Sequence, residues 1–263
     1  MIFKSIRLCI VYVFISIFIY SCASIKPDIV IPSKQPKSNK KIYHPRVALV
    51  LGGGGSRGYA HVGVIKALEN AGVPIDLIIG TSAGAIMGAI YADSSSSERL
   101  EKITMSANFW DYADIANIPF FGGVMSGNNL QNFLVKNIRA KNFDQLAIPL
   151  VVVATDFRKG VPYIIKGGPI PPAVLASSAV PGVVKPVYLY GKTLVDGGVV
   201  DNVAVDIAEQ YQPNLIVAVD VSSDLEDAKP ESEFSILYRS YSITLKKLSN
   251  LQLSKTHFVI KPN

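Results

Sequence analysis

Short apolar segments alternate with helical segments along most of this chain, and that alternation most constrains its fold. Val47–Leu51 is an apolar run that leads through consecutive glycines into a helical pattern over residues 59–71. Residues 77–79 form a second apolar run, followed by a helix of small residues expected over 83–92. Strands that alternate with helices form a sheet covered on both faces. The sequence therefore predicts an α/β fold with a mostly parallel central sheet.

Three later apolar runs extend the same pattern toward the C-terminus. Residues 150–154, 215–221 and 258–260 are predicted to be further strands. In the polar segment that follows the small-residue helix, Ser95 and Glu98 have the spacing of a capping box, which predicts a helix start there. The chain contains no internal repeats, so we expect one domain over residues 46–263.

The N-terminus has the pattern of a targeting segment. Lys4 and Arg7 precede an apolar stretch over residues 8–20, which is shorter than the ~20 residues that span a bilayer. The segment ends in a sequence that resembles a bacterial lipobox. We therefore expect a lipoprotein-type signal peptide over residues 1–21 and lipidation of Cys22. An uncleaved anchor helix and an ordinary secretory signal are the alternatives. All three place the domain across or onto a membrane, and the lipoprotein reading predicts an exported protein of the bacterial cell envelope, at the outer membrane.

Residues 22–45 are rich in proline and lysine and are predicted to be a lipid-anchored linker. Such a segment cannot bury a core of its own, and a solvated spacer is the favoured interpretation. Its lysines would lie near the bilayer surface.

Composition excludes several other classes. The chain is 49% hydrophobic and 17% charged, which is too apolar for a disordered protein. Its 2 cysteines cannot form a disulfide scaffold, and no cysteine and histidine cluster has zinc-site spacing, so no metal is expected. The net charge of +6 comes without a nucleic-acid-binding motif, so no nucleic-acid partner is expected.

The segment from Gly80 to Gly84 has the sequence Gly-Thr-Ser-Ala-Gly, between a predicted strand and a predicted helix. Such a turn exposes the hydroxyl of its serine, here Ser82, and the glycines on either side relieve the crowding of the backbone. The helix N-terminus also favours developing negative charge. Ser82 is therefore the predicted nucleophile, and a plain turn with Ser82 as helix cap is the alternative.

The glycine-rich loop of residues 52–58 also joins a strand to a helix. Backbone amides of Gly53, Gly54 and Gly55 could form an oxyanion hole, whereas the pattern Gly-x-Gly-x-x-Gly with Asp76 downstream could bind a dinucleotide. The ribose-binding acid should follow the second strand, but Asp76 precedes it, so the oxyanion hole is favoured. A Walker-type phosphate loop is excluded because Tyr59 stands where lysine is required.

Asp196 lies between a short apolar run and two glycines, Gly197 and Gly198. A partly desolvated carboxylate can act as the base for a serine hydroxyl, and the flanking glycines allow a close approach. An ordinary Asp-Gly turn is the alternative.

The order of these three motifs resembles the patatin-like phospholipase family. The resemblance extends over about residues 46–223 and includes further segments, at residues 59–63, 154–156, 176–182 and 217–222. One departure is Asp201-Asn202-Val203-Ala204, where Asn-x-Pro is usual in bacterial members.

The resemblance implies a three-layer α/β/α lipid acyl hydrolase that needs no cofactor. Ser82 would be the nucleophile and Asp196 its base, with the oxyanion hole at Gly53–Gly55. Gly58, Gly80, Gly84, Gly197 and Gly198 would support these motifs. The substrate would be a phospholipid, a lysophospholipid or another acyl ester at a membrane surface. A non-catalytic lipid-binding protein of the same fold and an acyltransferase with the same residues are the alternative functions.

Two histidines and an aromatic segment allow other interpretations. Ser82, Asp196 and His257 occur in α/β-hydrolase order, but His257 opens a strand-like run and Ser82 follows only the second strand, which argues against a triad. His61 is interpreted as structural. The aromatic side chains near residue 110 are interpreted as core rather than as a lipid-contacting surface. They are Phe109, Trp110, Tyr112, Phe120 and Phe121.

Overall fold

The computed structural model describes residues 33–40, 42, 44–114, 125–222, 232–254, 256 and 258–262. The predicted signal peptide, Cys22, Phe120, Phe121 and His257 lie outside the described residues. Among the helices of the described part, none is long and apolar enough to cross a membrane.

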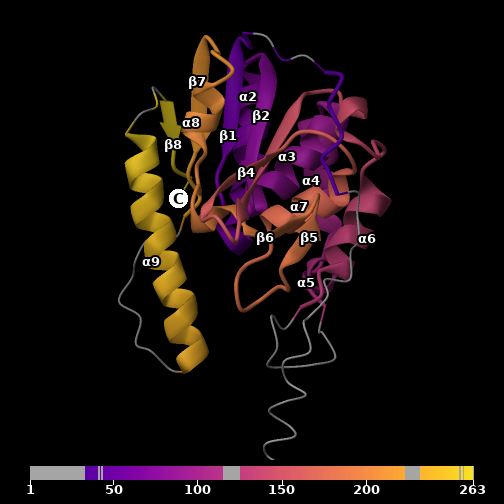
Figure 1. The fold of residues 1–263 in the computed structure, drawn as a ribbon. Coiled ribbons are helices and arrows are strands. Elements are labelled where there is room, and N and C mark those ends of the chain that lie inside the picture. Colours follow the sequence, from indigo (N-terminus) through magenta and orange to yellow (C-terminus); the bar gives the residue numbers. More distant parts are fainter. Residues whose placement is uncertain are drawn as a thin grey trace, which may run out of the picture.

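Within these residues an eight-stranded sheet has the order β5-β6-β3-β2-β1-β7-β8, with β4 also paired to β3 (Figure 1). The strands are β1 Val47–Leu51, β2 Ile75–Thr81, β3 Leu150–Asp156, β4 Val161–Ile165, β5 Val187–Leu189, β6 Lys192–Asp196, β7 Leu215–Val219 and β8 Phe258–Ile260. The run β3-β2-β1-β7-β8 is parallel, and β4, β5 and β6 add antiparallel pairs beside β3. The predicted parallel sheet is confirmed over that central run.

The antiparallel part results from a tight hairpin between β5 and β6. Tyr190 and Gly191 connect these strands, and both have positive φ, of 53° and 73°. Two consecutive residues with positive φ form the hairpin turn whose twist matches that of the paired strands. The hairpin brings the end of β6, and with it Asp196, beside Ala154 of β3.

The helices lie between the strands in sequence and on both sides of the sheet in space. They are η1 Gly55–Tyr59, α2 Ala60–Asn70, α3 Ala83–Ser94, α4 Ser97–Ser106, α5 Phe109–Tyr112, α6 Asn128–Asn137, η2 Phe143–Gln145, α7 Ile170–Ser177, η3 Gly197–Val199, α8 Val205–Glu209 and α9 Glu233–Leu253.

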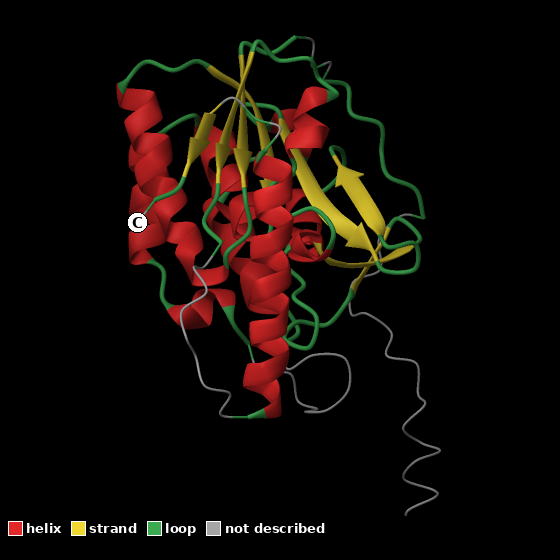
Figure 2. Cartoon of the chain, turned by 90° about the vertical axis from the view of Figure 1, so that its left-hand side faces the viewer, coloured by secondary structure: helices red, strands yellow, loops and turns green. Residues whose placement is uncertain are grey.

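Alternate residues of the buried strands belong to two separate apolar cores. Val47, Leu49 and Leu51 of β1 face the larger core, which α2, α3, α4, α6 and α7 complete. Ala48 and Val50 face the smaller core, which α8 and Leu253 of α9 complete. This side-chain alternation is the period of a strand buried on both faces, and it confirms the three-layer α/β/α architecture. α9 reaches beyond the carboxyl ends of the strands (Figure 2).

The predicted capping box at Ser95 and Glu98 is wrong by one residue. Ser96 is the N-cap of α4, and its hydroxyl accepts a hydrogen bond from the N–H of Arg99. Ser95 instead ends α3 in the left-handed conformation, with φ 52°. Ser95 is therefore already used to terminate the preceding helix.

Part of the segment interpreted as a solvated spacer lies against the domain. The Ser38 hydroxyl donates to Asp144 Oδ1 at 2.7 Å, and Ile42 packs against the smaller core. These contacts bring the residues just before the domain onto its surface, at the edge where the parallel strands begin.

Candidate active site

Ser82 occupies a strained turn between β2 and α3. Its φ of 53° and ψ of −121° are unusual for a residue with a side chain, and such strain is typical of functional turns. The glycines on either side are required by close packing. A Cβ on Gly80 would lie 2.7 Å from Ala85 Cα, and one on Gly84 would overlap the Leu51 carbonyl oxygen. The motif thus allows α3 to begin directly against β1.

The Ser82 hydroxyl donates a hydrogen bond to Asp196, with Oγ and Oδ2 2.6 Å apart. Asp196 ends β6 and is 1% exposed, and Ser82 is 8% exposed. The other carboxylate oxygen of Asp196 accepts the N–H of Gly198 at 2.7 Å. The hairpin and the strand-to-helix turn therefore bring together the two side chains that the sequence motifs singled out.

Burial raises the pKa of Asp196 from its usual value to about 6. The hydroxyl of Ser82, the N–H of Gly198 and the hydroxyl of Tyr241 all favour the charged carboxylate and limit that rise. At neutral pH the group is thus ionised but desolvated, which suits a carboxylate that accepts a proton.

Ser177, at the end of α7, holds the backbone of Ser82 in place. Its hydroxyl accepts the Ser82 N–H at 2.8 Å and donates to the Val153 carbonyl at 2.6 Å. No role for Ser177 was predicted from the sequence, because the residues around it do not indicate which backbone group its hydroxyl contacts.

The glycine loop is held by two hydrogen bonds to Asn202, one to its backbone and one from its side chain. The Gly53 N–H donates to the Asn202 carbonyl, and the Asn202 side-chain amide donates back to the Gly53 carbonyl, both at 3.2 Å. Within the described residues, the N–H groups of Gly54 and Gly55 donate to no acceptor. Both glycines line a cavity with Ser82 and Asp196. Asn202 therefore supports the loop, although its segment stood out in the sequence only as a departure from the family pattern.

His61 supports the same loop from within the core. It is fully buried, and its Nε2 lies 2.8 Å from the Gly52 carbonyl oxygen. A carbonyl oxygen only accepts hydrogen bonds, so Nε2 carries the hydrogen of the neutral ring and donates it. Desolvation lowers the pKa of His61 to about 4, so the ring is neutral. These contacts agree with the structural interpretation of His61.

The remaining glycines of the motifs lie around the same pair. Gly58 in η1 packs against Ala83, and Gly197 and Gly198 open η3 directly after Asp196. They extend the close packing of the backbone around Ser82 and Asp196.

An apolar cavity of about 400 Å³ opens beside Ser82. Its walls come from η1, α3, α5 and α6 and from segments near residues 125 and 180. The lining side chains are mostly apolar and include Tyr59, Ile86, Met87, Phe109, Tyr112, Met125, Leu130, Val180 and Val184. A cavity of this kind suits a hydrocarbon chain.

The interpretation of the aromatic segment as core is wrong for Phe109 and Trp110. Their side chains are 64% and 60% exposed. α5 is a single turn at the rim of the cavity, and these two rings pack edge to face on each other, with centroids 5.3 Å apart. Tyr112 is half-buried and packs against Phe133.

On the other side of Ser82, the inner face of α9 leaves little space. A cavity of about 40 Å³ is enclosed by the glycine loop, Ser82 and Asp196 together with Tyr238, Tyr241, Ser242 and Leu245 of α9. This volume holds water but not a lipid headgroup. No helix was predicted from the sequence over the residues of α9.

Asp76 cannot take the role that a dinucleotide site requires. Its carboxylate pairs with the Arg46 guanidinium at 2.8 Å, near the start of β2. The glycine loop follows the end of β1, which is parallel to β2. Asp76 and the glycine loop therefore lie at opposite ends of the parallel strands. No group of three or more histidine, cysteine or acidic side chains in the described part of the chain could hold a metal ion.

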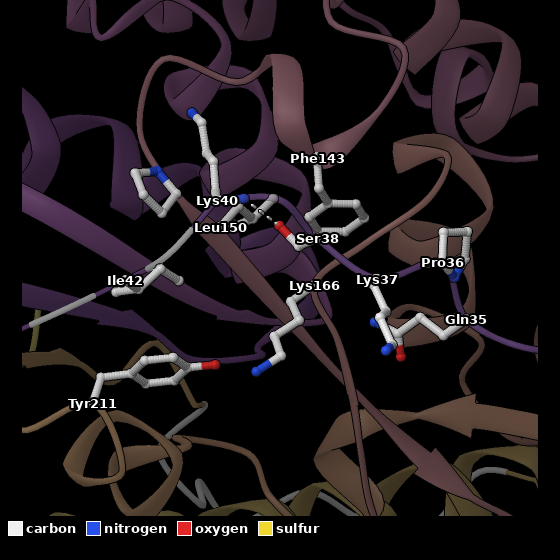
Figure 3. A pocket seen from close by; sticks show the side chains of 11 residues that line it. Gln35, Pro36, Lys37, Ser38, Lys40, Ile42, Phe143, Leu150, Lys166 and Tyr211 are labelled. Atoms are coloured by element: carbon white, nitrogen blue, oxygen red, sulfur yellow. Dashed lines mark hydrogen bonds between the residues drawn. The ribbon is translucent and has the colours of Figure 1, made fainter.

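A third cavity, of about 540 Å³, lies near the opposite ends of the parallel strands, where residues 35–42 meet the start of β3 (Figure 3). Three lysines line it, but they do not converge. Lys40 donates to the Leu146 carbonyl, and Lys166 Nζ lies 5.6 Å from the centre of the Tyr211 ring. Figure 3 shows Lys37 on the far side, next to Gln35.

Comparison with known proteins agrees with this arrangement. The family model described as patatin-like phospholipase matches residues 49–209. The mouse patatin-like phospholipase domain-containing protein 6 is 33% identical over 68% of this chain and 14% of its own length. The lysophospholipase nte1 of Aspergillus fumigatus is 35% identical over 70% of this chain and 12% of its own. An uncharacterized NTE family protein of Mycobacterium bovis is 34% identical over 71% of this chain and 53% of its own length.

The chain therefore matches only a minor part of the mouse and fungal relatives and about half of the mycobacterial one. Among solved structures, VipD from Legionella pneumophila has the same fold, with a TM-score of 0.52 at 15% identity over 84% of this chain and 58% of that one. The extent of the family match, together with the fold, shows that this chain belongs to the patatin-like phospholipase family.

Proposed function

We propose that the protein is a serine lipid acyl hydrolase of the phospholipase A or lysophospholipase type. The observation that carries the proposal is the 2.6 Å hydrogen bond from Ser82 to a buried Asp196, next to an apolar cavity. The relatives named as phospholipase and lysophospholipase support the same class of substrate.

In the proposed mechanism Asp196 accepts the proton of Ser82 as Oγ attacks the ester carbonyl carbon. Ser82 is held for this attack by Ser177, and its strained backbone directs Oγ into the site. The alcohol part of the lipid leaves with a proton from Asp196, and water then releases the fatty acid by the same steps in reverse. No step requires a cofactor.

We assign the oxyanion hole to the N–H groups of Gly54 and Gly55. The Gly53 N–H already donates to Asn202, so within the predicted glycine trio Gly53 has the role of fixing the loop. Preorganised amides of this kind stabilise the tetrahedral intermediate by hydrogen bonding.

Labelling with a fluorophosphonate tests the proposed chemistry directly, because the reagent phosphonylates an activated serine. We expect one label per chain, located on Ser82 by peptide mapping. A folded protein that takes up no label would support the non-catalytic lipid-binding alternative.

The pH dependence of kcat/KM reports the ionisation of Asp196 in the free enzyme. The carboxylate must be charged to accept a proton, so kcat/KM should fall below about pH 6, the raised pKa of Asp196. The Tyr241 hydroxyl favours the charged form, and Tyr241→Phe should therefore move the midpoint to higher pH. A pH profile of soluble-ester hydrolysis for both proteins checks this. An unchanged midpoint in Tyr241→Phe would contradict the proposed role of Tyr241.

The apolar cavity should determine the preferred acyl chain. Ile86 lies on α3 one turn from Ser82 and lines this cavity. Ile86→Trp should fill part of the space, so that kcat/KM falls for long-chain esters while short-chain esters are hydrolysed as before. A series of p-nitrophenyl esters of increasing chain length measures this. An equal loss for all chain lengths would contradict acyl binding in this cavity.

We further propose that the protein is exported and held at the cell envelope through Cys22, with a membrane surface as its partner. The support for this is the N-terminal sequence pattern. Metabolic labelling with a palmitate analogue, lost in Cys22→Ser, tests the lipid attachment.

A further inference from the structure

The outer face of α9 carries large apolar side chains that are exposed to solvent. Ile236, Leu237, Ile243 and Leu251 are all exposed, and Leu237 and Leu251 are each 69% accessible. A surface helix normally turns its apolar side chains toward the core. In α9 many of them point outward.

The inner face of α9 makes polar contacts that fix this orientation. The Ser249 hydroxyl accepts the side-chain amide of Asn202 at 2.8 Å. Gln252 accepts the Val203 N–H at 2.9 Å and donates to Asp201 Oδ1 at 2.7 Å. Turning the apolar face inward would break these contacts beside the candidate active site.

After Glu233, the first residue of α9, every charged residue of the helix is basic. From Ser235 to Leu253 the sequence contains Arg239, Lys246 and Lys247 and no acidic residue. Lys247 is exposed, in the middle of the apolar outer face. A helix with exposed aliphatic side chains among basic ones is typical of segments that lie in the interface of an anionic bilayer.

The N-terminal half of α9 also lies next to the entrance of the candidate active site. The Tyr238 hydroxyl lies 3.7 Å from where a Cβ of Gly55 would be, and Gly55 lines both cavities beside Ser82. Phe109, on the rim of the apolar cavity beside Ser82, is exposed as well. This half of α9 extends past the carboxyl ends of the strands (Figures 1 and 2).

We propose that the outer face of α9 docks the protein on an anionic lipid bilayer. The aliphatic side chains enter the boundary between headgroups and acyl chains, and Lys247 lies among the lipid phosphates. The proposal rests on the proposed function, because a lipid substrate must reach Ser82 from a bilayer. It adds the surface of contact and the charge of the lipid.

A local fluorescent probe tests the contact without relying on catalysis. In the full chain carrying Ser82→Ala, Cys9→Ser and Cys22→Ser, a single cysteine is introduced as Leu237→Cys or Leu251→Cys and labelled with an environment-sensitive dye. Val135→Cys on α6 is the matched control, because Val135 is 67% exposed, close to the 69% of the two leucines. Vesicles of phosphatidylcholine alone are compared with an equimolar mixture of phosphatidylcholine and phosphatidylglycerol.

We expect a blue shift and a severalfold rise in emission at positions 237 and 251 with the anionic vesicles, and no comparable change at 135. Lys247→Glu should weaken the response to anionic vesicles and leave the response to phosphatidylcholine unchanged. Equal responses at all three positions would overturn the proposal. So would a response that follows protein concentration without lipid, which would indicate a second copy of the chain. Docking by the Ser82→Ala protein with no fatty-acid release by the wild type would refute the proposed catalysis alone.

Discussion

Ser82→Ala should abolish fluorophosphonate labelling and lower kcat/KM for a soluble ester by about 10³-fold or more. The Ser82 hydroxyl donates to Asp196 at 2.6 Å, so its removal takes away the group that would attack the ester or the phosphonate. Asp196→Asn should cause a loss of similar size, because an amide cannot accept the serine proton. Labelling measured by intact mass and initial rates on a short-chain ester give both values.

The double variant and a second serine serve as controls for this result. Because the two residues act as a unit, Ser82→Ala with Asp196→Asn should be no less active than Ser82→Ala alone. Ser94→Ala removes a hydroxyl from the other end of α3, where the side chain has no hydrogen-bond partner within the described residues. Its activity should stay near that of the wild type. Full labelling of Ser82→Ala would contradict the assignment of the nucleophile.

Gly84→Ala should cost roughly 3 kcal/mol of stability or more, because overpacking against fixed backbone is not relieved by a rotamer change. The added Cβ would overlap the Leu51 carbonyl of β1, so α3 would have to move away from the sheet that it packs on. For a chain of this size the expected fall in Tm is roughly 6–12 °C. Thermal unfolding followed by circular dichroism measures it.

Gly63→Ala is the matched control, because it changes another helical glycine in the same way. Gly63 lies on the exposed side of α2 and has no atom within 4 Å of a built Cβ. Alanine is favoured over glycine in a helix by up to about 1 kcal/mol, so this variant should be slightly more stable than the wild type. Equal Tm values for the two variants would contradict the close packing at Gly84.

The parts of the fold that follow from local pattern were predictable. Val47–Leu51 and Phe258–Ile260 are apolar runs bounded by polar or glycine-rich segments, and both are strands with those bounds. The turn at Ser82 was also predictable, because the glycines that it requires, Gly80 and Gly84, lie only two residues away on either side. Local spacing carries this information.

The contacts that complete the site depend on distant parts of the chain. Ser177 and Asn202 support Ser82 and Gly53 from other elements, and nothing local distinguishes them from other polar residues. The pairing of Ser82 with Asp196 was predicted from the combination of their motifs, and the family resemblance implied the same pair. α9 was missed because its inner face is rich in hydroxyl groups, which hides the apolar period of a helix. Phe109 and Trp110 were assigned to the core because composition does not show that α5 lies at a cavity rim.

Fatty-acid release from phospholipid vesicles by the full chain, measured beside Ser82→Ala and Asp196→Asn, determines whether Ser82 and Asp196 hydrolyse lipid esters. We expect release by the wild type and loss of release in both variants, with the released products identifying the ester that is cleaved. Equal release by the wild type and Ser82→Ala would contradict catalysis at the hydrogen-bonded pair of Ser82 and Asp196.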